Sequence, residues 1–226
     1  MSLPIFALRP EPGAAATVAA GRERGLEIAA VPLFAIRPVA WSPPAPEALD
    51  ALLIGSANAI RHAGAGVAAF GHLPVYAVGE ATAAAAREAG FTVAATGEGG
   101  LQALLERTAP PLRLLRLAGA EHVPLTPPAG IELVMRVVYR ADPQPLPAAA
   151  AARLGNGAVV LLHSAAAARH FADECDRMAV PRGAVRLAAL GPRIAVAAGT
   201  GWGAVAVAAH PAEPPLLALA AELCHD

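Results

Sequence analysis

The sequence predicts an α/β protein with two similar doubly wound parallel-sheet domains. Two observations carry this prediction: a long internal repeat, and short apolar runs that alternate with alanine-rich segments at helical spacing. Buried parallel strands are continuous apolar runs, and each needs a crossover before the next strand of the sheet. A third observation, a pair of proline-rich stretches, indicates where the two domains divide.

The repeat is clearest in the segments LLIGSANAIRH at 52–62 and VLLHSAAAARH at 160–170, which lie 108 residues apart. Three further pairs are found at 25–28 with 130–133, around Gly79 with Gly191, and at 98–104 with 213–219. Along the chain the offset between partners rises slowly from 105 to 115. Such a pattern predicts a duplicated unit with small loop insertions.

The apolar runs and the segments between them predict the elements in order. In the first half we expect strands at 5–8, 28–31, 52–54, 75–78 and 112–117, and helices at 13–24, 57–70, 80–89 and 101–107. In the second half we expect strands near 133–139, 159–162, 187–190 and 205–208.

The proline-rich stretches at 37–47 and 141–150 each follow a strand-like run, VPLFAIRP or VMRVVYRA, and these runs are repeat partners. Their placement predicts paired hinge strands at 33–38 and 136–141. One domain is then continuous, 39–136, and the other is discontinuous, 1–34 with 142–226. The repeat alone does not prove this division.

Composition excludes several classes of function. All 17 basic residues are arginine, which excludes Schiff-base chemistry, pyridoxal phosphate and a P-loop lysine. The net charge of −1 argues against a nucleic-acid partner. A compositional drift towards arginine and alanine is the favoured explanation, although arginines would also suit a ligand with many carboxylates.

Targeting and cofactor signals are also missing. The longest window without charge, 194–212, is broken by glycines and a proline, so we expect no membrane span. No basic region precedes the first apolar run, and the two cysteines form no CxxC pair, so we expect a reduced, cytoplasmic protein. Histidines and carboxylates form no metal-ligand pattern, and we expect neither a metal nor another cofactor.

Two glycine motifs resemble a dinucleotide fingerprint, GTGWGA at 199–204 and GAGVAA at 64–69. A dinucleotide site needs this motif to leave a strand and open a helix. Both motifs follow a predicted helix, so we interpret them as helix ends and loops and predict no nicotinamide site.

Polar candidates lie where predicted strands end. Ser56 and Ser164 each separate a strand from a helix, where a serine caps the helix and where the first N–H groups can also hold a carboxylate. Gly79 and Gly191 occupy similar turns, with Thr82 in the first helical turn after Gly79. Tyr139 lies on the second hinge strand, where packing and catalysis are both open interpretations.

The ordered set of segments resembles the uroporphyrinogen-III synthase family. The segments are LRPEPGAAATVAAGRERGLEIAAVPLFAIRP, LLIGSANAIRH, VYAVGEATAAAAREAGF, VVYRA, LLHSAAAARHF, LAALGPRIA and HPAEPPLLAL, and they span nearly the whole chain in family order. The resemblance implies two flavodoxin-like α/β domains joined by a two-stranded β linker.

The resemblance also implies a reaction. The linear tetrapyrrole hydroxymethylbilane loses its terminal hydroxyl as water, its ring D is inverted, and it closes to uroporphyrinogen III without a cofactor. Tyr139 matches a tyrosine that the family is proposed to use as general acid. The implied contacts to the substrate carboxylates are Arg9, Ser56, Ala57, Asn58, Gly79, Thr82, Ser164, Ala165, Gly191 and Arg193. We expect a monomer.

The chain departs from the family pattern at Gly55, His163 and Arg193, where threonine is common. These departures keep a second hypothesis open, a non-catalytic module of the same build that binds a tetrapyrrole or another small ligand. A nicotinamide reductase is a third hypothesis, which the placement of the glycines disfavours.

Overall fold

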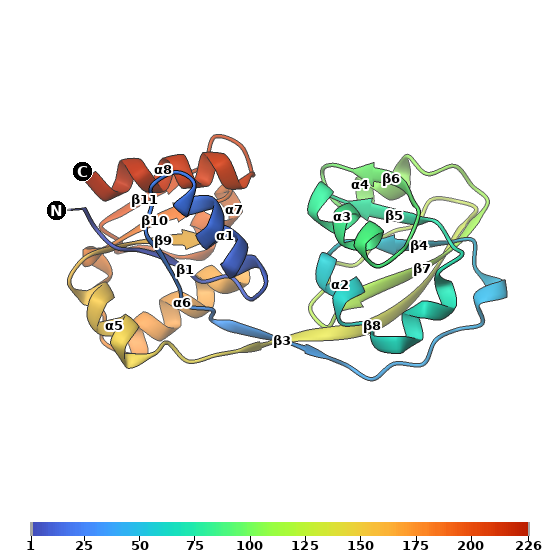
Figure 1. The fold of residues 1–226 in the computed structure, drawn as a ribbon, viewed down its shortest axis with the longest axis horizontal. Helices are drawn as coiled ribbons and strands as arrows, with labels where there is room; N and C mark the ends of the chain where they lie inside the picture. Colours follow the sequence, from blue (N-terminus) through green and yellow to red (C-terminus); the bar gives the residue numbers. More distant parts are fainter. Residues whose placement is uncertain (1, 226) are drawn as a thin grey trace. The chain divides into compact units, whose positions relative to one another are not determined.

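The computed structural model describes residues 2–225, apart from the side chain of His225. It shows a mixed α/β protein with parallel sheets, which confirms the predicted class (Figure 1). The chain divides into two compact units. Unit 1 comprises Met1–Ala35 with Asp142–Asp226, and unit 2 comprises Ile36–Ala141.

Unit 1 is built on a five-stranded sheet in the order β11-β10-β9-β1-β2, in which every neighbouring pair is parallel. The strands are β1 (Ile5–Ala7), β2 (Ile28–Ala30), β9 (Ala158–Leu162), β10 (Val185–Ala189) and β11 (Ala204–Val207). The helices are α1 (Gly13–Arg22), α5 (Ala148–Gly155), α6 (Ala165–Arg177), α7 (Pro192–Ala197) and α8 (Glu213–His225), with a 3-10 turn at Arg182–Ala184. Figure 1 shows α8 on one side of this sheet and α5 and α6 on the other.

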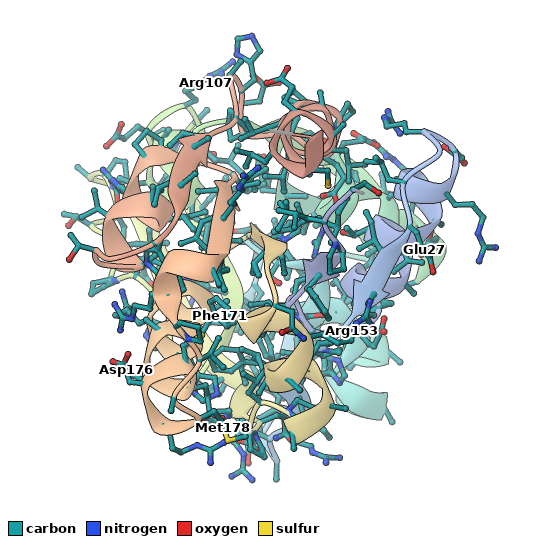
Figure 2. All side chains as sticks on the ribbon, turned by 90° about the vertical axis from the view of Figure 1, so that its left-hand side faces the viewer. Glu27, Arg107, Arg153, Phe171, Asp176 and Met178 are labelled. Carbon is teal, nitrogen blue, oxygen red and sulfur yellow. The ribbon has the colours of Figure 1, made fainter. Side chains whose placement is uncertain are left out.

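Helix α6 illustrates how the sequence sets these layers. Its apolar residues recur at helical spacing, so one stripe faces the sheet and the other faces water. Phe171 is fully buried in the cluster between the sheet and α5, α6 and α7, whereas Asp176 is exposed. Figure 2 shows this contrast along one helix.

Unit 2 carries a six-stranded sheet in the order β3-β8-β7-β4-β5-β6. The strands are β3 (Phe34–Pro38), β4 (Ala51–Ile54), β5 (Val75–Val78), β6 (Val93–Gly97), β7 (Leu112–Gly119) and β8 (Ile131–Pro143). The helices are α2 (Ala57–Arg61), α3 (Glu80–Glu88) and α4 (Leu101–Glu106), with 3-10 helices at Pro46–Ala48 and Gly64–Phe70. Strands β4 to β8 pair in parallel.

The two sheets have the same strand order once the chain of unit 1 is read from β9. When the edge strand β3 is left out, the order β9, β10, β11, β1, β2 along that path corresponds to β4, β5, β6, β7, β8, and the central one of the five strands is the first of each series. Each of the repeat pairs found in the sequence then falls on corresponding elements. The duplication therefore describes the fold, with unit 1 circularly permuted relative to unit 2.

The units differ between their last two strands. In unit 1, helix α1 connects β1 to β2, whereas in unit 2 an irregular loop at 120–130 connects β7 to β8. Gln102 fixes this loop by two hydrogen bonds of 3.0 Å to the backbone of Thr126. Arg116 is only 4% exposed and donates to the carbonyl of Val123 at 2.8 Å. Burial lowers the pKa of Arg116, and its long side chain fills space under a loop that supplies less packing than a helix.

The structure differs from the predicted elements in two places. The helix expected at 57–70 ends at Arg61 and is followed by a 3-10 helix, because Gly64 takes the left-handed conformation at φ +66°. Strand β6 was not predicted. Only alternate residues of its VAATG segment turn towards the protein, so it lacks the continuous apolar run that marks the buried strands.

Strands β3 and β8 are neighbours, and their bonding follows the duplication. The N–H of Val39 donates to the carbonyl of Val138, and the N–H of Gln144 donates to that of Leu33, each at 2.9 Å. Residue 39 corresponds to 144 and residue 33 to 138 at the repeat offset of 105, so the two bonds are repeat partners. The duplicated pattern thus extends through this strand pair.

The segment that follows β8 is hydrogen-bonded to α6. The Nε2 atom of His170 lies 2.8 Å from the carbonyl of Gln144, and a carboxylate oxygen of Glu174 accepts the N–H of Leu146 at 2.6 Å. Glu174 also accepts hydrogen bonds from Nη2 and Nε of Arg177, at 2.6 and 2.8 Å. The bond from Arg177, helped by the N–H of Leu146, lowers the pKa of Glu174 to about 2 although burial opposes ionisation.

Residues near the two ends of the chain meet at the edge of unit 1 where β1 begins. The N–H of Leu3 donates to the carbonyl of Cys224 at 3.2 Å, and the Cys224 thiol donates to the carbonyl of Leu3 at 3.4 Å. The first strand is therefore tied to the last helix.

We expect Glu174→Gln to lower the free energy of unfolding by about 2 kcal/mol at pH 7, because charge-assisted hydrogen bonds to a buried group are lost. Folding depresses this pKa from 4.5 to about 2. The stabilisation is therefore fully present above about 4.5 and is lost as the pH falls towards 2. Urea unfolding at several pH values between 7 and 3 measures the difference.

Asp176→Asn is the matched control, because this carboxylate lies on the same helix and its side chain is 63% exposed. We expect it to cost less than about 1 kcal/mol. A Glu174→Gln effect of constant size from pH 7 to pH 3 would contradict the assignment.

Candidate functional site

Both serine turns lie at the carboxyl edge of a sheet. Ser56 follows β4 and begins α2, and Ser164 follows β9 and begins α6. The Ser56 hydroxyl accepts the N–H of Asn58 at 3.3 Å, and that of Ser164 accepts the N–H of Ala167 at 3.1 Å. Both serines therefore cap helices, with nearly equal backbone angles.

The glycine turns lie beside the serine turns. Gly79 follows β5, which pairs with β4, and Gly191 follows β10, which pairs with β9. Gly79 has φ +76°, a conformation that few other residues adopt. Each unit thus brings one serine turn and one glycine turn to the ends of neighbouring strands, and each turn begins a helix.

The remaining predicted contacts follow these turns. Ala57 and Asn58 open α2, and Ala165 opens α6. Thr82 is buried in the first turn of α3, whereas Arg193 is exposed in the first turn of α7. The fold therefore collects these predicted residues at the carboxyl edges of the two sheets.

Tyr139 lies on β8, half buried, beside the end of β7. Its ring covers Gly119: a Cβ atom at Gly119 would lie 2.7 Å from Cζ and 2.9 Å from the phenol oxygen. The ring of His62 has its centre 6.4 Å from that of Tyr139. Burial, reinforced by the charge of Arg61, lowers the pKa of His62.

Unit 1 holds a cluster of polar side chains around Glu213, at the carboxyl ends of β1 and β9. Its members, Arg9, Thr17, His163 and Glu213, come from four different elements or the turns that follow them. Glu213 Oε1 accepts the hydroxyl of Thr17 at 2.5 Å, and Oε2 accepts Arg9 Nη1 at 3.2 Å. His163 Nε2 lies 3.2 and 3.4 Å from the two carboxylate oxygens.

The cluster holds a charged carboxylate. Burial raises the pKa of a carboxyl group, but hydrogen bonds from His163 and Thr17, with cationic Arg9 nearby, outweigh this effect and the pKa of Glu213 lies below its ordinary value. The sequence predicted Arg9 as a contact, but it did not predict that Thr17, His163 and Glu213 are its neighbours. The repeat pair 98–104 with 213–219 marked the position of Glu213 without indicating its contacts.

The glycine motifs do not form dinucleotide sites. GTGWGA follows α7 and leads into β11, and GAGVAA lies within the 3-10 helix after α2. Among residues 2–225, no group of three or more histidine, cysteine or acidic side chains is arranged to hold a metal ion. No helix in that range is long and apolar enough to cross a membrane.

Comparisons with known structures identify the fold. The crystal structure of uroporphyrinogen-III synthetase from Helicobacter pylori matches with a TM-score of 0.66 and 18% identity, over 98% of this chain and 99% of that one. A mutant uroporphyrinogen III synthase from the extremely thermophilic bacterium Thermus thermophilus matches with a TM-score of 0.52 and 18% identity, over 96% and 97% of the two chains. At this identity the likeness shows the fold alone.

A search of curated protein sequences found no match. The sequence model of the family described as uroporphyrinogen-III synthase HemD matches residues 15–218, which is most of the chain. This range includes both serine turns, both glycine turns and Tyr139. The chain therefore belongs to the uroporphyrinogen-III synthase family.

Proposed function

We propose that this chain cyclises hydroxymethylbilane to uroporphyrinogen III, with inversion of ring D and loss of one water, using residues at the carboxyl edges of its two sheets. The family match over residues 15–218 is the observation that supports this reaction. The substrate is a flexible chain of pyrroles with acetate and propionate side chains. Because the unguided bilane closes to the type I isomer, the protein must control its conformation.

The turns after β4, β5, β9 and β10 are suited to bind these carboxylates. Helix N-termini offer N–H groups without intrahelical partners and the positive end of the helix dipole. Ser56 and Ser164 occupy one N–H of their own helices, which leaves the other first-turn N–H groups for a ligand. The proposed contacts are Arg9, Ser56, Ala57, Asn58, Gly79, Thr82, Ser164, Ala165, Gly191 and Arg193.

Tyr139 is the proposed general acid. A phenol donates its hydrogen to the leaving hydroxyl, and the proton moves to that oxygen as the C–O bond breaks and water departs. The remaining cation is stabilised by its own pyrrole nitrogen. Positioning then contributes more than proton transfer, and the contact with Gly119 holds the ring in one place.

We further propose that the units are two flavodoxin-like domains of a cytoplasmic monomer. The domains are 1–34 with 142–226 and 39–136, and the strands at 33–38 and 136–141 form the linker. The strand orders and the division of the chain into compact units support this reading. Sedimentation of the purified protein with and without nucleic acid tests the monomer and the expected lack of nucleic-acid binding.

The direct test of the function is turnover of hydroxymethylbilane by purified protein without added metal or nucleotide. Chromatographic separation of the isomers should give the type III product. Folded protein that leaves only the spontaneous type I product would reject the enzyme and favour a binding module of the same fold.

We expect Tyr139→Phe to reduce kcat by about 10²–10⁴ because general-acid assistance is lost. The fold, the KM and the type III outcome should persist, since the ring that packs on Gly119 is kept. Steady-state kinetics with isomer analysis measures all three. Unchanged kcat would return Tyr139 to a packing role, and a type I product would mean that it shapes the bilane.

We expect Gly119→Ala to lower kcat as well, because the new methyl group occupies the place of the Tyr139 ring and displaces the phenol. Gly183→Ala is the control: it lies in a turn of unit 1 where a Cβ atom meets nothing within 4 Å. Kinetics and thermal unfolding of both variants check the prediction. If Gly119→Ala retains full kcat, the position of the phenol does not matter.

A further inference from the structure

We infer that Glu213 is a positioning residue, which holds the guanidinium of Arg9 at the carboxyl edge of unit 1 so that Arg9 binds a carboxylate of the substrate. The inference rests on the proposed function and adds to it a second residue that acts through Arg9. His163 and Thr17 complete the arrangement by fixing Glu213.

The carboxylate of Glu213 is held from three directions. Thr17 is fully buried and donates to Oε1, and the side chain of His163 is 8% exposed and contacts both oxygens. An ionised carboxylate only accepts hydrogen bonds, so His163 donates to it from Nε2. Glu213 therefore has little freedom to rotate, and its hydrogen bond to Arg9 restrains the guanidinium in turn.

Arg9 is the most exposed member of the cluster. Its side chain is 34% exposed, and its hydrogen bonds to Thr17 and Glu213 both use Nη1. The guanidinium also lies against Gly13, the first residue of α1, where a side chain would collide with it. The exposed part of a guanidinium held in this way offers the planar donor geometry that suits a carboxylate.

The position of the cluster in the sheet favours a ligand. Strand β1 continues through α1 to β2 on one side, whereas β9 continues through α6 to β10 on the other. The strand order reverses between β1 and β9, and ligands of doubly wound sheets bind outside the carboxyl ends of the strands at this point. Arg9 follows β1 and His163 follows β9.

Unit 2 shows that the fold does not require this cluster. By strand register, Ala118 corresponds to Arg9 and Gly55 corresponds to His163. A Cβ atom at Gly55 would lie 2.6 Å from Leu101, so an apolar side chain of α4 occupies the equivalent space. Glu98, the repeat partner of Glu213, is exposed. Charged residues at only one of two equivalent sites indicate a function beyond folding.

Glu213→Gln tests the inference, because it keeps the shape and removes the charge. If Glu213 orders Arg9, the KM for hydroxymethylbilane should rise about tenfold, with a much smaller change in kcat. If Glu213 acts only as a negative charge near an anionic substrate, the KM should fall instead, and the inference is overturned. Glu98→Gln is the matched control and should leave both constants unchanged.

A double-mutant cycle separates positioning from a purely structural role. Arg9→Gln should raise the KM at least as much as Glu213→Gln, and combining the two should add nothing further, because Glu213 acts through Arg9. Additive effects on KM overturn the inference. So does a Glu213→Gln variant that unfolds at a lower temperature but keeps the wild-type KM below that temperature.

Binding of uroporphyrin III, measured by fluorescence titration, distinguishes the inference from the proposed function. If the wild-type protein binds this carboxylated porphyrin without converting hydroxymethylbilane, the enzyme proposal fails. The double-mutant cycle of Arg9→Gln and Glu213→Gln is then measured with the Kd for uroporphyrin III in place of the KM. Equal, non-additive losses of affinity in Arg9→Gln and Glu213→Gln then support the inference. Unchanged affinity in both variants rejects it.

Discussion

Parallel strand pairing is the constraint on which the site depends. A parallel strand cannot return through a tight turn, so each one is followed by a crossover that brings the chain back to the same starting edge. All turns that leave the strands therefore collect at the opposite, carboxyl edge. Ser56 and Gly79 become neighbours in one sheet, and Ser164 and Gly191 in the other, although 23 to 27 residues separate them in sequence.

Duplication explains why the same turns occur twice, and the differences between the copies show which features the fold needs. Both units keep a capping serine after the central strand. In unit 1 a helix, α1, follows β1. In unit 2 the corresponding strand, β7, is followed by a loop packed over the buried side chain of Arg116. Capping is thus common to both copies, whereas the charged residues around Glu213 belong to one.

Much of this architecture could be predicted because short stretches of sequence determine it. The apolar runs marked the buried strands, and serine or glycine between a run and an alanine-rich segment marked the helix starts. The break at Gly64 depends on one left-handed residue, and β6 has an alternating rather than a continuous apolar pattern, so both escaped prediction. Arg9 and Glu213 are 204 residues apart. No local sequence pattern predicts such a contact, because only the folded sheet brings Arg9 and Glu213 together.

The contact between Leu3 and Cys224 has a consequence for the history of the chain. Because the two ends of unit 1 are hydrogen-bonded neighbours, a short peptide could join them without disturbing the sheet. A gene rearranged in this way and reopened before α5 would encode unit 1 as one uninterrupted segment, with its strands in the order found in unit 2. In the present chain unit 2 lies inside unit 1 as an insertion, because Ile36–Ala141 separates the two segments of unit 1.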